Sequence, residues 1–222
     1  MGETRGAGWR AQAARQHGVL GRRQLRDLGV SRATIRAQVS AGRWAWRTGS
    51  VLTTTTGPLS WGQRLWVAVL HCGPGSAVGG LSAAAVHGLR GWDRPRVTVL
   101  VPGPLSFAPV EGLHVVRTRR PIGTALAPGR LPVWQVEPAV LLFAGYEPSR
   151  RTGLAAVAAV VQQRLSTPER LRETLATMHP LRRARDLRAL LADLADLPDL
   201  AGRGEAAPLA LGVPRTGARR AG

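Results

Sequence analysis

Lysine is absent from the 222 residues, so the combined count of 31 lysines and arginines consists of arginines alone. With 13 acidic residues, the formal net charge is +18 at pH 7, which favours polyanions as partners. The many glycines, prolines and arginines also indicate a GC-rich coding sequence, so a solvated surface set by codon usage is the alternative interpretation. However, residues 1–47 hold ten arginines against only Glu3 and Asp27. This clustering favours a functional basic surface near the N-terminus.

Cysteine occurs once, at Cys72, which excludes an internal disulfide and a zinc site built from several cysteines. Because Cys72 lies in an apolar run, we expect an inert, buried thiol. The five histidines lack the spacing of metal ligands. The glycine-rich residues 72–80 lack the Gly-Lys-Ser/Thr ending of a phosphate-binding loop. We therefore assign no catalytic residue, cofactor or metal, and we do not expect an enzyme.

Long hydrophobic runs are missing as well. The N-terminus has no apolar signal segment, and the run at residues 66–70 is far too short to span a bilayer. No strongly amphipathic terminal helix is present to anchor the chain on a membrane surface. We expect a cytoplasmic protein without a membrane partner.

The most informative segment is a pair of amphipathic helices joined by a glycine. Leu25 and Leu28 are three residues apart, so they share one face of the first helix. Ser31 is a suitable N-cap for the second helix, because its side-chain oxygen can accept from the first free N–H groups. Ile35 and Val39 then face the core together. A pair of this kind with a basic, slim outer face is what DNA recognition requires.

The outer face of the second helix carries Thr34, Arg36, Ala37 and Gln38. Arginine and glutamine can bond base edges, and an alanine methyl can pack on a thymine methyl. After Gly42, residues alternate with period two around Thr48 and Gly49, which predicts a β-hairpin. With a first helix at residues 9–17, three helices and a hairpin predict a winged helix-turn-helix at residues 10–56.

Arginines dominate the predicted DNA-binding set. Arg32 and Arg36 are expected to bond phosphates or base edges. The arginines of the preceding helix are expected to clamp phosphate, and those of the hairpin to reach an adjacent groove or the backbone. The full set is Arg22, Arg23, Arg26, Ser31, Arg32, Thr34, Arg36, Ala37, Gln38, Arg43 and Arg47.

A second domain is predicted at residues 58–196. It begins with a buried helix at residues 60–70 capped by Ser60, a loop at residues 72–80, and a short helix capped by Ser82. Three valine-rich segments predict strands, at residues 96–101, 113–118 and 131–136. Helices are predicted at residues 139–146, 153–165, 168–178 and 182–195. The last helix is expected to turn a basic face to solvent, made of Arg182, Arg183, Arg185 and Arg188.

These elements give an α+β fold class: an N-terminal winged helix, then a small mixed α/β domain with a helical C-terminal part. Residues 197–222 have no aromatic residue and no hydrophobic periodicity, and they are rich in Gly, Pro, Arg and Ala. This composition predicts a disordered basic tail.

The chain resembles the AbiEi family. The resemblance rests on the Arg-rich helix, the Gly-Val-Ser-Arg joint, the Ala-Gly-Arg-Trp helix ending and the Arg-Thr-Gly-Ser hairpin. It extends over about residues 10–196 through the stretches WGQRLWVAVL, LSAAAVHGL, VTVLVP and HVVRTRR. Members of this family are antitoxins and transcriptional regulators of type IV toxin–antitoxin systems. The resemblance implies that the chain binds double-stranded DNA and represses its own promoter. It also implies a functional partner, a nucleotidyltransferase toxin encoded by the neighbouring gene. Because winged helices often act as dimers, a homodimer is a possible assembly.

Many relatives of this kind continue into a domain that resembles the very-short-patch-repair endonucleases. Such nucleases need clustered carboxylates that hold a divalent metal, commonly with a lysine. The late acids of this chain lie instead on one helix and in the tail, so we expect the nuclease domain to be absent. The composition change near Leu197 suggests a truncated or frame-shifted gene. Two alternatives to a regulator are therefore an inactive remnant of a DNA-binding endonuclease fusion and a protein-interaction module.

Overall fold

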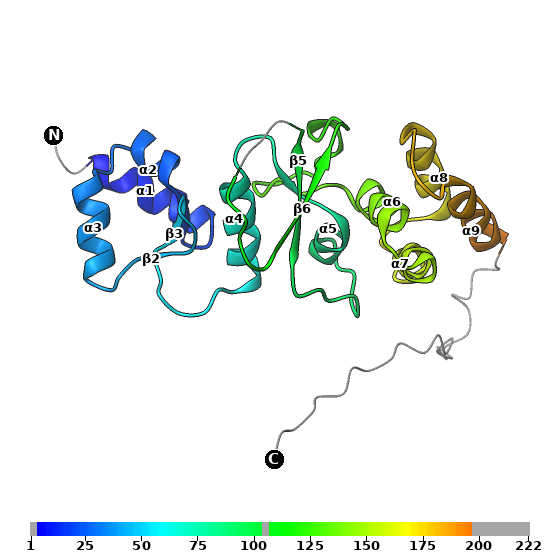
Figure 1. Cartoon of the computed structure of the whole chain (residues 1–222), viewed down its shortest axis with the longest axis horizontal. Helices are drawn as coiled ribbons and strands as arrows, with labels where there is room; N and C mark the ends of the chain where they lie inside the picture. Colours follow the sequence, from blue (N-terminus) through cyan, green and yellow to red (C-terminus); the bar gives the residue numbers. More distant parts are fainter. Residues whose placement is uncertain (1–3, 104–106, 197–222) are drawn as a thin grey trace, which may run out of the picture.

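The computed structural model describes residues 4–103 and 107–196. These residues form an elongated α+β molecule whose layers follow the order of the chain from one end to the other (Figure 1). The predicted α+β class is confirmed at this level. The predicted disordered tail, residues 197–222, lies outside the described residues.

The N-terminal unit combines three helices with a small antiparallel sheet of order β1-β3-β2. Its elements are α1 (Thr4–Arg15), β1 (Val19–Gly21), α2 (Arg22–Asp27), α3 (Arg32–Ser40), β2 (Ala45–Trp46) and β3 (Val51–Thr53). The predicted hairpin is confirmed as β2–β3. The first helix starts earlier and ends sooner than residues 9–17. Strand β1 was not predicted, because three residues are too few to show a period.

Successive side chains of β1 and β3 point to opposite faces of this sheet, and both faces are buried. Leu20 pairs with Leu52, and both are fully buried against the three helices. Val19 and Val51 point the opposite way, toward α4. The helical side holds a compact core of Ala13, Leu20, Leu25, Ile35, Trp44 and Leu52. The sheet therefore binds the three helices on one side and the rest of the chain on the other.

Helix α4 (Trp61–Cys72) lies between the N-terminal unit and the second sheet (Figure 1). Its start is fixed by a capping box in which Ser60 and Gln63 bond each other's backbone N–H groups, at 3.3 and 3.0 Å. The predicted cap and helix are thus confirmed. Trp66 and Val67 pack on the valines of the first sheet. The two predicted domains therefore meet through an apolar contact.

The second sheet has the order β4-β5-β6, made of β4 (Ala77–Val78), β5 (Val97–Pro102) and β6 (Leu113–Thr118). Strand β4 is antiparallel to β5, and β6 is parallel to it. Helix α4 covers one face, and α5 (Gly80–Val86) and α6 (Val136–Tyr146) lie on the other (Figure 1). The strands expected at residues 96–101 and 113–118 are confirmed, each within one residue.

Three expectations for this region were wrong. Residues 72–80 are not all loop, because Ala77 and Val78 pair with β5. Ser82 does not cap α5 but lies inside it, buried, where its Oγ accepts from the backbone N–H of Thr98 at 2.9 Å. Residues 131–136 do not form a strand; they make isolated bridges at Val133 and Trp134 and then enter α6. A short 3-10 turn, η1 (Gly123–Ala125), precedes them.

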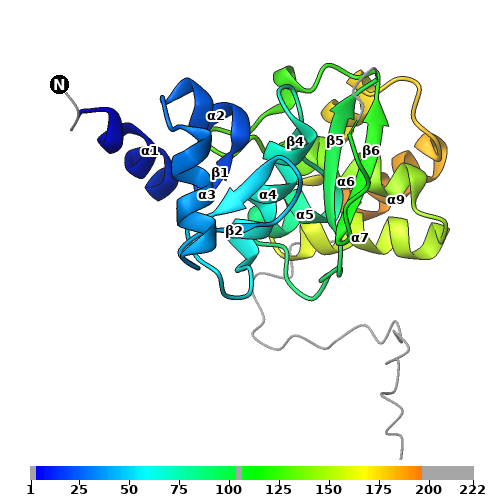
Figure 2. The same cartoon turned by 60° about the vertical axis from the view of Figure 1, so that its left-hand side comes forward.

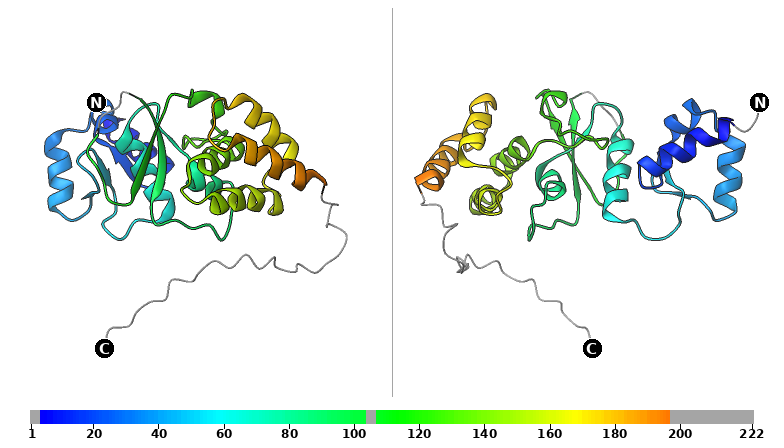
Figure 3. Two further views of the ribbon diagram at one scale, coloured as in Figure 1. Left: turned by 45° about the vertical axis from the view of Figure 1, so that its right-hand side comes forward. Right: turned by 180° about the vertical axis from the view of Figure 1, so that it is seen from behind.

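Two helical pairs complete the described chain (Figure 3). They are α6 with α7 (Arg150–Gln162), and α8 (Pro168–Thr177) with α9 (Ala184–Asp196). Helix α7 approaches α6 so closely that a Cβ on Gly153 would lie 2.8 Å from the carbonyl oxygen of Ala144. Glu137 is buried on α6, where it accepts from Ser166 and pairs with Arg170, both at 2.8 Å. Thr167 caps α8, because its hydroxyl oxygen accepts from the backbone N–H of Arg170 at 3.3 Å.

Cys72 is buried at the end of α4, as expected from its apolar neighbours. Burial raises the pKa of its thiol to about 11. Because the thiolate is the reactive form, we expect no alkylation of the folded protein by iodoacetamide at about pH 8. The protein unfolded in guanidinium chloride should take up one alkyl group, which mass spectrometry detects. Rapid alkylation of the folded protein would contradict this burial.

Candidate nucleic-acid interface

Helix α3 is fixed at its start by Ser31. The Ser31 Oγ accepts from the backbone N–H of Thr34 at 3.0 Å, and the two hydroxyl groups are 2.9 Å apart. The predicted N-cap is confirmed. Both side chains are exposed, so they lie on the surface while also defining where the helix begins.

One side of α3 faces the core and the other faces solvent. Ile35 is only 7% exposed, and the half-buried Val39 packs on the same cluster. The fully exposed side carries Arg32, Ala33, Arg36 and Ala37. Within residues 4–103 and 107–196, neither the Arg32 nor the Arg36 guanidinium has a hydrogen-bond or ion-pair partner. Helix α3 lies at one end of the molecule in Figure 1, and in Figure 2 it lies beside α2 on the N-terminal unit.

Helix α2 adds three exposed arginines beside α3. The Arg22 guanidinium lies over the Trp46 ring, 4.8 Å from its centroid, which links α2 to strand β2. Arg23 and Arg26 approach the Asp27 carboxylate at 3.9 and 3.4 Å. Exposed pairs of this kind contribute little to stability. A phosphate can therefore compete with Asp27 for either arginine.

Gln38 and Arg43 bond each other where α3 ends. The Arg43 Nε donates to Gln38 Oε1 at 2.6 Å, and the Gln38 carbonyl accepts from the backbone N–H of Arg43 at 3.0 Å. The turn between them contains Gly42, whose φ of 67° lies in the left-handed region that glycine favours. The amide of Gln38 is thus engaged at its oxygen, while Arg43 is held beside the helix end.

Arg47 is committed to the protein itself. Its guanidinium donates to the Thr53 hydroxyl at 2.8 Å and to the carbonyls of Thr55 and Gly57 at 3.1 and 2.7 Å. These bonds hold the hairpin against the segment that leads to α4. We therefore assign Arg47 to positioning the hairpin and not to contacting a nucleic acid.

Trp46 and Arg10 lie near this surface but were not among the predicted DNA-binding residues. Trp46 is 37% exposed, whereas Trp44, two residues before it, is 4% exposed and meets Trp9 edge-on at 4.9 Å. Arg10 of α1 lies over the Trp9 ring at 4.8 Å. Period-two alternation places residues two apart on the same face, so the sequence pattern did not separate the exposed Trp46 from the buried Trp44. The position of α1 beside the hairpin could not be predicted from the sequence either.

The charge of this unit is strongly one-sided. Residues 19–53 contain seven arginines and one acid, Asp27. Six of the arginines are exposed, and only Arg47 is half-buried. A surface of this composition attracts phosphate and should release bound counterions when it does.

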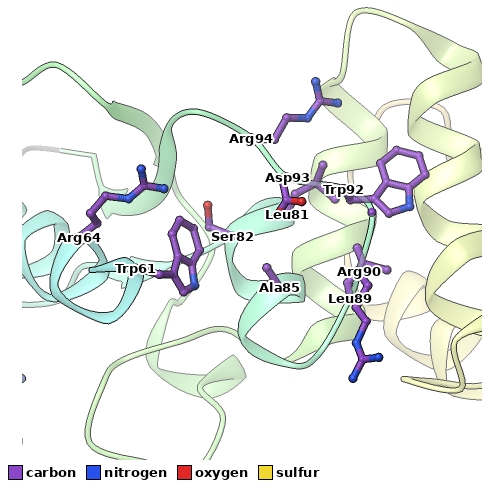
Figure 4. A pocket seen from close by; sticks show the side chains of 11 residues that line it. Trp61, Arg64, Leu81, Ser82, Ala85, Leu89, Arg90, Trp92, Asp93 and Arg94 are labelled. Carbon is purple, nitrogen blue, oxygen red and sulfur yellow. The ribbon is translucent and has the colours of Figure 1, made fainter. Parts of the chain in front are cut away.

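A hollow of about 340 Å³, separate from the α3 surface, lies between the start of α4, helix α5 and residues 89–94. Figure 4 shows Trp61 on one side of it and Asp93 with Trp92 on the other. The nearby guanidinium groups do not converge on one point in this view. Arg64 instead lies over the Trp61 ring at 4.9 Å. We assign no ligand to this hollow.

The described residues contain no group of three or more His, Cys, Asp or Glu side chains placed to hold a metal ion. Among the same residues, none of the helices has both the length and the apolar character needed to cross a membrane.

Comparison with known proteins gives a fold relationship only. No family model matches the chain, and no curated protein matches it. Among solved structures, the chain is similar to the RV2827C protein from Mycobacterium tuberculosis, with a TM-score of 0.50 and 20% sequence identity. The similarity covers 86% of this chain and 78% of that one. At this identity the two chains share a fold, and nothing about function follows.

Proposed function

We propose that this chain is a DNA-binding transcriptional regulator whose N-terminal unit is a winged helix. The observation that carries the proposal is the exposed side of α3, where Arg32 and Arg36 have no partner within the described chain. They stand one helical turn apart on α3, which lies at one end of the molecule (Figure 1). An unpaired pair of guanidiniums at that place is suited to an external anion.

The order of elements supports the winged-helix interpretation. A helix, a strand, two helices and a hairpin follow one another, and α2 and α3 are joined at Gly29 with a φ of 73°. In such a unit the second helix of the pair enters the major groove. Ala33 and Ala37 keep the exposed side of α3 slim enough for close approach. In our proposal Arg32 and Arg36 reach base edges or phosphates.

The neighbouring arginines extend the contact. Arg22, Arg23 and Arg26 on α2 lie where the helix preceding a recognition helix meets the phosphate backbone. Arg43 lies at the far end of α3, next to the hairpin. We propose that these four side chains bind phosphate without reading sequence. Trp46, at the end of β2 next to the hairpin turn, supports Arg22 by stacking.

The resemblance to the AbiEi family extends the proposal to biology. On that basis we propose that the chain acts in the cytoplasm, represses its own promoter and serves as the antitoxin to a nucleotidyltransferase toxin encoded next to it. This part rests on the resemblance alone.

The proposal is tested by titrating the full chain with its own upstream DNA and with a scrambled duplex at several salt concentrations. We expect tighter binding to the upstream sequence, by about a thousandfold or more for a specific regulator. We also expect log K to fall linearly with log salt, with a slope close to the number of phosphates bound. Equal, weak binding to both duplexes would reject the regulator and favour an inactive remnant. Binding with little dependence on salt would favour a protein-interaction module.

A further inference from the structure

A cavity of about 420 Å³ lies on the face of the second sheet that is turned away from the N-terminal unit. Its floor is formed by β5 and β6, and its walls by the start of α5 and the end of α6. This volume falls within the range of about 300–1,000 Å³ that is typical of small-molecule sites. The cavity shares no residue with the candidate nucleic-acid interface.

The floor changes from polar to apolar along the strands. Thr98 pairs with His114, and Leu100 pairs with Val116, so these four side chains lie on one face of the sheet. Arg96 lies two residues before Thr98 and lines the same cavity. One end of the floor is therefore cationic or polar, and the other end is apolar.

The wall opposite the floor is held in place by an arginine from outside the cavity. Arg183 donates to the carbonyl of Ala144 at 2.9 Å, to the carbonyl of Glu147, and to the carbonyl of Pro148 at 3.1 Å. These bonds supply donors to carbonyl groups at and just after the end of α6, where a helix leaves its last carbonyls without intrahelical donors. They tie the end of α6, which carries the wall residues Phe143 and Tyr146, to the start of α9.

The arginines that line the cavity outnumber its single glutamate, so the cavity has an excess of positive charge. Arg94 pairs loosely with Glu147 at 3.9 Å and lies 5.6 Å from the Phe143 ring. The Arg96 guanidinium has no ion-pair or hydrogen-bond partner in the part of the chain that the structure describes. One carboxylate thus faces two guanidiniums, which leaves one positive charge beside an apolar recess.

We infer that this cavity binds a small molecule with an apolar body and a single carboxylate. The carboxylate would lie between Arg96 and His114, and the apolar body against Leu100, Val116 and Leu142. Such a ligand matches the cavity in both charge and polarity. The inference is independent of the proposed DNA binding, because the two sites share no residue.

The test uses n-octanoate as the probe, with n-octylamine and 1-octanol as probes of the same body but different charge. Isothermal titration of the full chain should show saturable binding of octanoate at one site and much weaker binding of the other two. Octanoate should also raise the melting temperature, because ligand binding stabilises the folded state by an amount that grows with the logarithm of one plus the ligand concentration over Kd. Octylamine that binds as well as octanoate would overturn the inference.

Two variants locate the site. Arg96→Gln removes the exposed guanidinium without touching the core, and it should weaken octanoate binding about tenfold. Val116→Phe should fill the apolar end and abolish binding, with circular dichroism confirming that the variant is folded. Arg188→Gln, on α9 at the far end of the molecule, removes the same charge and should bind octanoate normally (Figure 1). Unchanged binding in Arg96→Gln overturns the inference even when Val116→Phe does not fold. An Arg36→Ala variant should keep octanoate binding, which separates this test from that of DNA binding.

Discussion

Replacing Trp44 with alanine should unfold the N-terminal unit and remove DNA binding with it. The Trp44 side chain is 4% exposed and is the largest in a core of only six buried residues. Truncating a buried tryptophan costs about 3–5 kcal/mol. A core of this size rarely supplies more than about 3–5 kcal/mol of stability. The edge-on contact with Trp9, at 4.9 Å, is lost as well.

Trypsin digestion followed by mass spectrometry measures this effect. We expect the arginines of α2 and α3 to become cleavable, while residues 61–196 stay intact because the main core is separate from that of the N-terminal unit. Circular dichroism should show a corresponding loss of helix. DNA affinity should fall to the level of a disordered basic segment.

The matched control is Trp46→Ala. Trp46 is two residues away and is 37% exposed, with its ring under the Arg22 guanidinium. Its removal should cost no more than about 1 kcal/mol, the value of an exposed cation–π contact. Equal destabilisation by the two variants would contradict the packing described for the hairpin.

Helix α3 could be predicted from sequence because its signals are local. The cap at Ser31, the core-facing pair at Ile35 and Val39, and the stop at Gly42 all lie within twelve residues. Each depends on geometry that a single helix imposes on its own neighbours. Seven of its nine residues are exposed or half-buried outside the core, so no distant packing overrides these preferences.

The short strands could not be predicted for the opposite reason. Strand β4 has two residues and exists because Ala77 and Val78 find partners about twenty positions later, on β5. A Cβ on Gly79 would lie 2.4 Å from Leu100 Cγ, so the adjacent glycine allows this approach. In the sequence the same glycines indicate a loop. Residues 131–136 show the opposite error. Their valines predict a strand, but only Val133 and Trp134 find bridge partners before the chain enters α6.

Arginine roles divide in the same way. Arg47 and Arg183 were expected to face DNA and solvent, respectively. In the structure Arg47 bonds the carbonyls of Thr55 and Gly57, and Arg183 bonds carbonyls at the end of α6. Every residue carries a backbone carbonyl, so the sequence does not show which carbonyls will accept a hydrogen bond from an arginine. The exposed arginines of α3 were identified correctly as exposed, because helix periodicity alone fixes which side they occupy.

Removing both unpaired arginines of α3, in an Arg32→Ala/Arg36→Ala variant, should cause the second large loss. Each contact with a base or a phosphate is worth about 1–3 kcal/mol. Because the two residues are neighbours one turn apart, the loss for the pair should be larger than either single loss without being their exact sum. Alanine favours helix, and no described ion pair is broken, so the melting temperature should not fall. Fluorescence anisotropy with labelled upstream DNA measures the affinity, and differential scanning calorimetry measures the stability.

The control must remove the same charge from another helix, and Arg185→Ala/Arg188→Ala does so. Both residues are exposed on α9, at the opposite end of the molecule from α3 (Figure 1). If DNA contacts α3, the α9 variant should lose little affinity, because charges more than about 10 Å from a phosphate are screened at about 0.1 M salt. The α3 variant should also lose its preference for the upstream duplex if one of its arginines reads a base, and it should show a shallower salt slope by about one unit for each arginine that binds phosphate. Equal losses in the two variants would mean that net charge, and not the α3 surface, attracts DNA to this chain.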